Sequence, residues 1–122
     1  MATIERFEDI KAWQKARELV RIVYHLSTPA KKLGKDFGLR DQIRRASISV
    51  MSNIAEGFAR RGDKEFKRFL SIALGSAAEI QSQLYAALDL HYITKKEFQD
   101  AYDVALETGK LITGFMQYLN TD

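Results

Sequence analysis

Residues 66–88 read FKRFLSIALGSAAEIQSQLYAAL, and this stretch carries the clearest periodic pattern in the chain. Its apolar side chains recur at spacings of three and four, and they are Phe66, Phe69, Leu70, Ala73, Ala77, Ile80, Leu84, Ala87 and Leu88. Such a stripe lies along one side of an α-helix, because a helical turn takes 3.6 residues. The heptad-like period is typical of helices that pack about 20° from antiparallel. We therefore predict a long helix inside a helical bundle.

Three more apolar stripes of helical period lie on either side of this helix. Together they predict helices at roughly 9–27, 37–60, 63–90 and 94–119. The connections are short, and no segment alternates apolar and polar residues as a half-buried strand does. No internal repeat supports a helical solenoid. The sequence therefore predicts an all-α protein, an antiparallel up-down four-helix bundle, in a single domain over residues 1–122.

Several residues are predicted to satisfy free backbone groups at the helix ends. Asp9 is expected to cap the first helix. After the second helix, Gly62 is expected to adopt a positive φ as a C-cap, and Asp63 to accept from the free amides of the third. Thr94 and Glu97 have the spacing of a capping box at the start of the fourth helix.

The composition is that of a globular protein in a reducing compartment. Hydrophobic residues make up 46% and charged residues 29%, unlike a disordered chain. The absence of cysteine excludes disulfides, thiolate metal sites and cysteine nucleophiles. No stretch approaches the roughly 18 apolar residues of a membrane span, and the N-terminal residues lack the apolar run of a targeting segment. We expect a cytoplasmic protein with no membrane partner.

Charge is unevenly distributed along the chain, whose net charge is +3. The first 88 residues carry 16 basic and 10 acidic side chains, whereas the remainder carries 3 and 6. We identify candidate nucleic-acid-binding residues on the second helix and around the turn that follows it, namely Arg44, Arg45, Arg60, Arg61, Lys64, Lys67 and Arg68. Such a cluster neutralises phosphates without reading base sequence. The alternative is a solvated, charge-rich helical hairpin.

A second basic group is expected at the opposite end of the bundle. Its members are Lys31, Lys32, Lys35, Arg40, Lys95 and Lys96, and Arg44 and Arg45 extend it along the second helix. Part of it lies in residues 30–38, which are predicted to form a basic loop with two glycines.

Four polar residues lie among small or apolar ones on the second and third helices: Asn53, Glu56, Ser76 and Glu79. One interpretation makes the two carboxylates an acid and a base, with the other two side chains orienting a substrate. The other is a polar network, in the core or at an interface, that fixes helix register. No nucleophile, phosphate-binding loop or cofactor motif accompanies them, and neither histidine belongs to a Glu-x-x-His metal pair. We favour the network and predict no catalytic residue, metal or cofactor, and no enzyme activity.

The fourth helix carries a second apolar line outside its inner stripe. Val104, Leu111 and Tyr118 form it at intervals of seven residues. One interpretation is a broad core face. The other is a subunit interface of a homo-oligomer, in which the acidic residues of this helix meet basic helices of a neighbour.

Ordered motifs on the second and third helices carry a family resemblance. They read FGLRDQ at 37–42, RRASIS at 44–49, SNIAEG at 52–57 and ALGS at 73–76. With matching residues from about Phe7 to Leu119, this set resembles the four-helix-bundle proteins encoded in intervening sequences of bacterial 23S rRNA genes. The run from Thr28 to Asp36 departs from the family pattern by being longer and more basic.

The resemblance implies a ring-forming bundle, a pentamer, with no established enzyme activity. The family is similar in build to the accessory variability determinant of diversity-generating retroelements, a basic pentameric barrel associated with nucleic acid and a reverse transcriptase. The positions that carry over, as structural or interaction residues, are Gln42, Arg44, Arg45, Ser49, Asn53, Glu56, Arg60 and Glu79. None of them is implied to be catalytic.

Two hypotheses follow from the sequence. The first is a homo-oligomeric bundle that binds RNA or DNA backbones through the basic residues, with an affinity that falls steeply as salt rises. The second is a structural or adaptor module that engages a protein partner, its basic residues serving only solubility.

Overall fold

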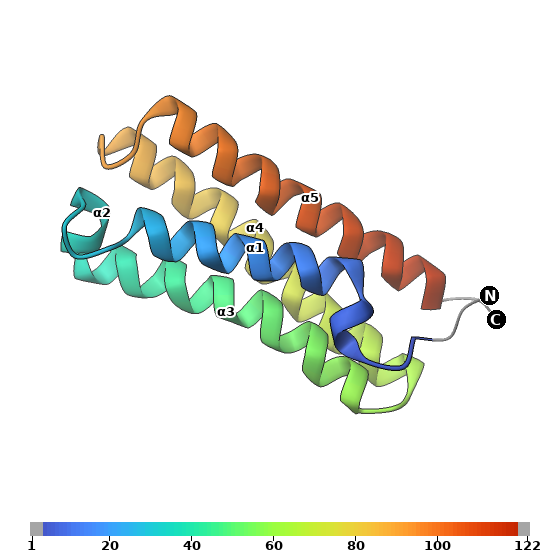
Figure 1. The fold of residues 1–122 in the computed structure, drawn as a ribbon. Helices are drawn as coiled ribbons and strands as arrows, with labels where there is room; N and C mark the ends of the chain where they lie inside the picture. Colours follow the sequence, from blue (N-terminus) through green and yellow to red (C-terminus); the bar gives the residue numbers. More distant parts are fainter. Residues whose placement is uncertain (1–3, 120–122) are drawn as a thin grey trace.

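The computed structural model describes residues 4–119, and every regular element in that range is helical. In chain order the elements are the 3-10 turn η1 (Phe7–Asp9) and the helices α1 (Lys11–Leu26), α2 (Lys32–Lys35), α3 (Phe37–Ala59), α4 (Asp63–Asp89) and α5 (Lys95–Leu119). The four long helices run alternately up and down (Figure 1). The predicted all-α, up-down four-helix bundle is therefore confirmed. The first and last three residues of the expected domain lie outside the described range.

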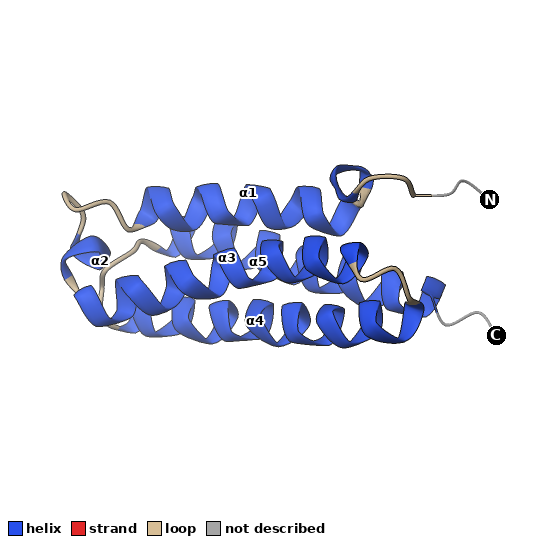
Figure 2. Ribbon diagram, turned by 90° about the horizontal axis from the view of Figure 1, so that it is seen from below, coloured by secondary structure: helices blue, strands red, loops and turns tan. Residues whose placement is uncertain are grey.

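Each long helix packs against two others. Helix α1 contacts α3 and α5, and α4 contacts the same two helices from the other side (Figure 2). The largest fully buried apolar side chains come from these four helices and from α2, and they are Leu19, Val23, Leu33, Ile43, Val50, Ile54, Leu70, Ile80, Leu84 and Ile112. Burial of one such side chain stabilises a fold by about 1.5–3 kcal/mol. The shared core thus makes each helix depend on its neighbours.

Helix α3 packs closely on α4 at Gly57. A Cβ atom at this position would lie 2.8 Å from Cδ1 of Phe66 and 2.8 Å from Cβ of Phe69. A side chain at this position would force Phe66 and Phe69 to shift. This close approach fixes where the turn between the two helices lies, and therefore where its charged residues lie.

The first helix begins later than the sequence predicts. It starts at Lys11, and Asp9 belongs to the preceding 3-10 turn rather than capping the helix. Ile10 occupies the N-cap position and is buried. The Phe7 ring meets the ring of Trp13 edge-on, 5.1 Å between centroids. Burial of these apolar groups directs the chain into the helix, so the expected carboxylate cap was wrong.

The turn between α3 and α4 also differs from its prediction. Arg61, not Gly62, has the positive φ, at 62°. Gly62 is extended and forms the N-cap of α4, while Asp63 is the first helical residue and provides no side-chain cap. The amides of Arg60 and Arg61 bond to carbonyls of the last turn of α3, at 3.2 and 3.4 Å. The chain therefore reverses one residue earlier than expected.

Residues 30–38 are not entirely the loop that their composition predicts. They include the one-turn helix α2, which buries Leu33. A Cβ atom on Gly34 would lie 1.8 Å from the carbonyl oxygen of Thr28, so the two backbone segments are in direct contact. This connection is therefore packed against the end of α1.

The remaining helix ends follow local sequence rules. The carboxylate of Asp36 accepts from the amide of Leu39 at 3.1 Å at the start of α3. At the start of α5, the side chains of Thr94 and Glu97 bond to each other's backbone amides at 3.0 and 2.9 Å. The predicted capping box is confirmed.

Candidate nucleic-acid interface

Two arginines flank one buried ring at the turn between α3 and α4. The guanidinium carbons of Arg60 and Arg68 lie 5.1 and 4.7 Å from the centroid of the Phe69 ring. The ring is only 6% exposed, whereas the two arginine side chains are 50% and 57% exposed. One arginine follows the end of α3 and the other lies early in α4, and the close packing at Gly57 brings both to the same ring.

Carboxylates on the same helices hold these arginines in place. Arg60 bonds to Glu56 at 3.1 Å, and Arg68 bonds to both oxygens of Glu65 at 3.2 Å. The hydrogen bond from Arg68 holds the pKa of the Glu65 carboxyl below its ordinary value, and the same bond raises the pKa of the Arg68 guanidinium. Exposed ion pairs contribute little to stability, so an incoming phosphate can compete for these guanidinium groups.

The other members of this cluster are arranged differently. The side chains of Arg61 and Lys64 are exposed and form no ion pair or hydrogen bond with any residue of the described range. Arg61 also borders a cavity lined by Ile4, Glu5, Phe7, Phe58 and Ala59, which brings the N-terminal segment beside the turn. Lys67 is half-buried on α4. We call Arg60, Arg61, Lys64, Lys67 and Arg68 the turn patch.

Arg44 and Arg45 do not belong to this patch. Arg44 donates from Nε to the Ser27 hydroxyl at 2.8 Å and from Nη2 to the Ser27 carbonyl at 2.7 Å. Its guanidinium also lies over the Tyr24 ring, 4.4 Å from the centroid. Arg45 is exposed and borders an open polar cavity of about 400 Å³ with Glu79. Arg44 is therefore hydrogen-bonded within the chain, and Arg45 lies apart from the turn patch.

The four polar residues on α3 and α4 separate into two groups. Nδ2 of Asn53 donates to the carbonyl of Ser49 at 2.8 Å and to its hydroxyl at 3.0 Å, and that hydroxyl lies 2.9 Å from the hydroxyl of Ser76. This network links α3 to α4. Glu56 and Glu79 are exposed and lie outside it.

The two carboxylates are not brought together as an acid and a base. Glu56 pairs with Arg60 beside the turn, whereas Glu79 accepts from Gln83 at 3.4 Å and borders the cavity beside Arg45. Among residues 4–119, no three His, Cys, Asp or Glu side chains gather where they could hold a metal ion. None of the described helices is both long enough and apolar enough to cross a membrane.

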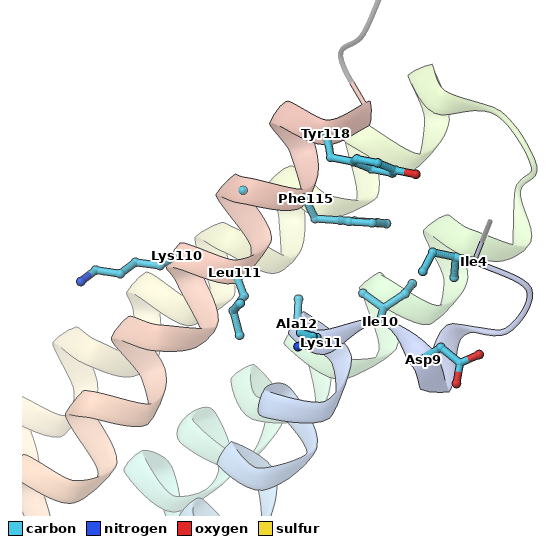
Figure 3. Close-up of a pocket in the computed structure, with 10 residues that line it drawn as sticks. Ile4, Asp9, Ile10, Lys11, Ala12, Lys110, Leu111, Phe115 and Tyr118 are labelled. Carbon is cyan, nitrogen blue, oxygen red and sulfur yellow. The ribbon is translucent and has the colours of Figure 1, made fainter. Parts of the chain in front are cut away.

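The second apolar line of α5 is partly covered within one chain. Val104 and Leu111 are half-buried against the core, and Tyr118 is 37% exposed with its ring stacked on Phe115 at 5.5 Å. Leu111 and Tyr118 border an open apolar groove of about 350 Å³ between α5 and the start of α1 (Figure 3). Ile4 and Ile10 face them across this groove. No sequence signal indicates this second side of the groove, because the residues before the first helix follow no periodic pattern.

The helices and these surface groups define a small up-down four-helix bundle that carries exposed basic residues at the turn between α3 and α4. The chain belongs to the 23S rRNA-intervening sequence protein family, whose model matches residues 8–114. The resemblance inferred from its motifs is therefore confirmed. It is similar to the crystal structure of a protein of unknown function from the S23 ribosomal protein family of Bacteroides thetaiotaomicron. That protein is 27% identical, with a TM-score of 0.79 over 88% of this chain and 96% of the other. No curated protein matches the chain.

Proposed function

We propose that this protein is a non-enzymatic, homo-oligomeric bundle of the cytoplasm that binds RNA or DNA backbones through the turn patch. The observation that carries the proposal is the pair of guanidinium groups on Phe69, with the unpaired cations of Arg61 and Lys64 beside them. The ring and the carboxylates limit the conformations of both arginines, which lowers the entropy lost when a phosphate binds. The lack of cysteine fits a reducing cytoplasm.

The turn patch suits phosphates better than bases. Its aromatic ring is buried beneath the two arginines, so no base can stack on it. Contacts from arginine and lysine to phosphate position a nucleic acid without reading its sequence. We therefore expect binding that depends on salt and is insensitive to base composition.

Assembly of several chains would strengthen weak backbone binding, because linked sites act at a high effective concentration. Tyr118 offers an exposed apolar contact on α5, and acidic residues stand on the same helix, namely Asp100, Asp103 and Glu107. These carboxylates are complementary to the basic first three-quarters of a neighbouring chain. The proposal of five subunits rests on the resemblance to the family alone.

The test is fluorescence anisotropy with a labelled RNA duplex at two salt concentrations. The double variant Arg61→Gln/Lys64→Gln removes two unpaired charges from the turn patch. The matched control Lys95→Gln/Lys96→Gln removes the same charge at the opposite end of the bundle. We expect the first variant to weaken binding and to reduce the salt slope by about two, and the control to bind as the unchanged protein does. Equal binding by both variants would argue against the turn patch.

The adaptor function is a second candidate, favoured by the apolar groove beside Leu111 and Tyr118. A protein segment of amphipathic character would bury its apolar side there. Affinity purification before and after nuclease treatment separates the two candidates. Recovery of one stoichiometric protein partner that nuclease leaves unchanged, together with no duplex binding, would favour the adaptor.

A further inference from the structure

Phe37, the first residue of α3, is exposed to an unusual degree. It is 65% exposed, the highest value for a large apolar side chain in the described range. A phenylalanine in this position exposes to water an apolar surface that would be buried in the core of a protein. The guanidinium of Arg40 lies 4.7 Å from the centroid of its ring. Phe37 is therefore a ring supported from within the chain and open to solvent.

The charges around this ring favour an anionic partner. Between residues 31 and 41 the chain carries four basic and two acidic side chains. Both carboxylates are occupied: Asp36 accepts from Leu39 and Tyr92, and Asp41 binds Arg40. The side chains of Lys32 and Lys35 are exposed and bond to no described residue. Two lysine side chains without a bonding partner in the described range thus lie on the short helix that precedes Phe37.

We infer that this end of the bundle binds an unpaired base of single-stranded RNA or DNA. The base stacks on the Phe37 ring, which Arg40 supports, and Lys32 and Lys35 contact the adjoining phosphates. Aromatic stacking combined with basic groups is the usual basis of single-strand binding. The inference builds on the proposed function only in taking nucleic acid as the partner. It concerns the end of the molecule opposite the turn patch (Figure 1).

Two ends with different chemistry would then bind different features of a nucleic acid. The turn patch has a buried ring and meets phosphates, whereas Phe37 offers a ring face that only an unpaired base can reach. In a duplex the bases are stacked on one another, so their faces are not accessible to Phe37. Loss of the Phe37 ring should therefore affect single strands selectively.

The variant Phe37→Trp provides a direct reporter, because the chain has one other tryptophan, Trp13, and that side chain is only 8% exposed. Three probes are used: a thymine oligonucleotide of about eight nucleotides, an abasic strand of the same length, and a duplex. We expect the thymine strand to quench the new tryptophan and the abasic strand and duplex to leave it unchanged. Phe37→Ala should weaken single-strand binding on the order of 10-fold, with duplex binding unaltered.

The control Ile72→Ala removes another exposed apolar side chain, on α4, and should bind all probes normally. Circular dichroism checks that each variant is folded. An unquenched tryptophan, or equal loss of single-strand and duplex binding by Phe37→Ala, would overturn the inference. So would a change in oligomer mass with unchanged single-strand binding, since Phe37 would then be a subunit contact. If the duplex binds but no strand quenches the tryptophan, only the inference about Phe37 is refuted. If the thymine strand quenches the tryptophan but the duplex does not bind, the inference about Phe37 is supported and backbone binding by the turn patch is refuted.

Discussion

Arg44 joins α3 to the end of α1. The last carbonyls of a helix lack partners within the helix and carry partial negative charge. Arg44 donates to the carbonyl of Ser27, and the Ser27 hydroxyl in turn donates to the carbonyl of Val23 at 2.7 Å. Ser27 itself is completely buried. This arginine therefore neutralises a helix end that solvent cannot reach.

We expect Arg44→Ala to lower the free energy of unfolding by about 2 kcal/mol, because it leaves the buried Ser27 groups without a charged donor. Arg45→Ala is the control, since the exposed neighbour bonds to no residue of the described range, and it should change stability by less than about 0.5 kcal/mol. Urea denaturation of the two variants gives the comparison. Similar midpoints for both would contradict the structural role assigned to Arg44.

Tyr92 links the connection after α4 to the start of α3. Its hydroxyl donates to Asp36 at 2.9 Å, and this hydrogen bond raises the pKa of Tyr92 above its ordinary value of 10.0. The bond stabilises the fold fully below that pH and is lost as the pH rises through the raised pKa. Tyr92→Phe should therefore be less stable than the unchanged protein at about pH 8, and the difference should shrink above about pH 10.

Thermal unfolding across that range measures the effect of Tyr92. Tyr85→Phe is a suitable control, because the Tyr85 hydroxyl has no hydrogen-bond partner among the described residues and its ring keeps its contacts with Phe98. A stability difference for Tyr92→Phe that stayed constant with pH would mean that the bond to Asp36 does not form.

At the scale of helices, two glycines show how the packing of α3 on α4 is set. Gly57 lies against Phe66 and Phe69, whereas a side chain at Gly75 would meet nothing within 4 Å. We expect Gly57→Ala to destabilise the protein by about 1–3 kcal/mol through overpacking. Gly75→Ala should stabilise it by about 0.5–1 kcal/mol through helix propensity. Chemical denaturation should give opposite signs, and equal signs would contradict the described helix contact.

Helix ends show what the sequence can and cannot predict. The capping box of Thr94 and Glu97 depends on residues three apart, and the sequence predicts it correctly. Asp9 and Gly62 fail as predicted caps because burial of Ile10 and the early reversal at Arg61 override local preference. Contacts between residues that are distant in the sequence determine where those helices begin and end, and a local sequence pattern does not indicate such contacts.

At the scale of the molecule, the up-down order was predictable because four amphipathic helices with short links leave few alternatives. That order also correctly predicts that the turn patch and the second basic group lie at opposite ends.

The different environments of Arg44 and Arg45 could not be predicted from the sequence. Consecutive helical residues point about 100° apart, and only the neighbouring segments show which of the two side chains is hydrogen-bonded within the chain. The exposure of Phe37 also escaped prediction, since a phenylalanine beside a helix start is ordinarily buried.

Self-assembly is a property of the whole molecule that light scattering measures. We expect a mass several times the 13.9 kDa of one chain. Tyr118→Glu places a charge on the exposed apolar line of α5 and should reduce that mass. Ile72→Glu, which places the same charge on the exposed side of α4, should retain it. A monomeric unchanged protein would contradict the proposed oligomer.

The salt dependence of duplex RNA binding is the most direct test of backbone binding by the turn patch. Each phosphate neutralised contributes about −0.9 to the slope of log affinity against log salt concentration. If three to five cations of the turn patch contact phosphates, the slope should be about −2.7 to −4.5 for each bound subunit. A slope in that range, reduced in Arg61→Gln/Lys64→Gln, is the predicted result. Binding that does not change with salt, or no binding at low salt, would rule out backbone binding by the turn patch.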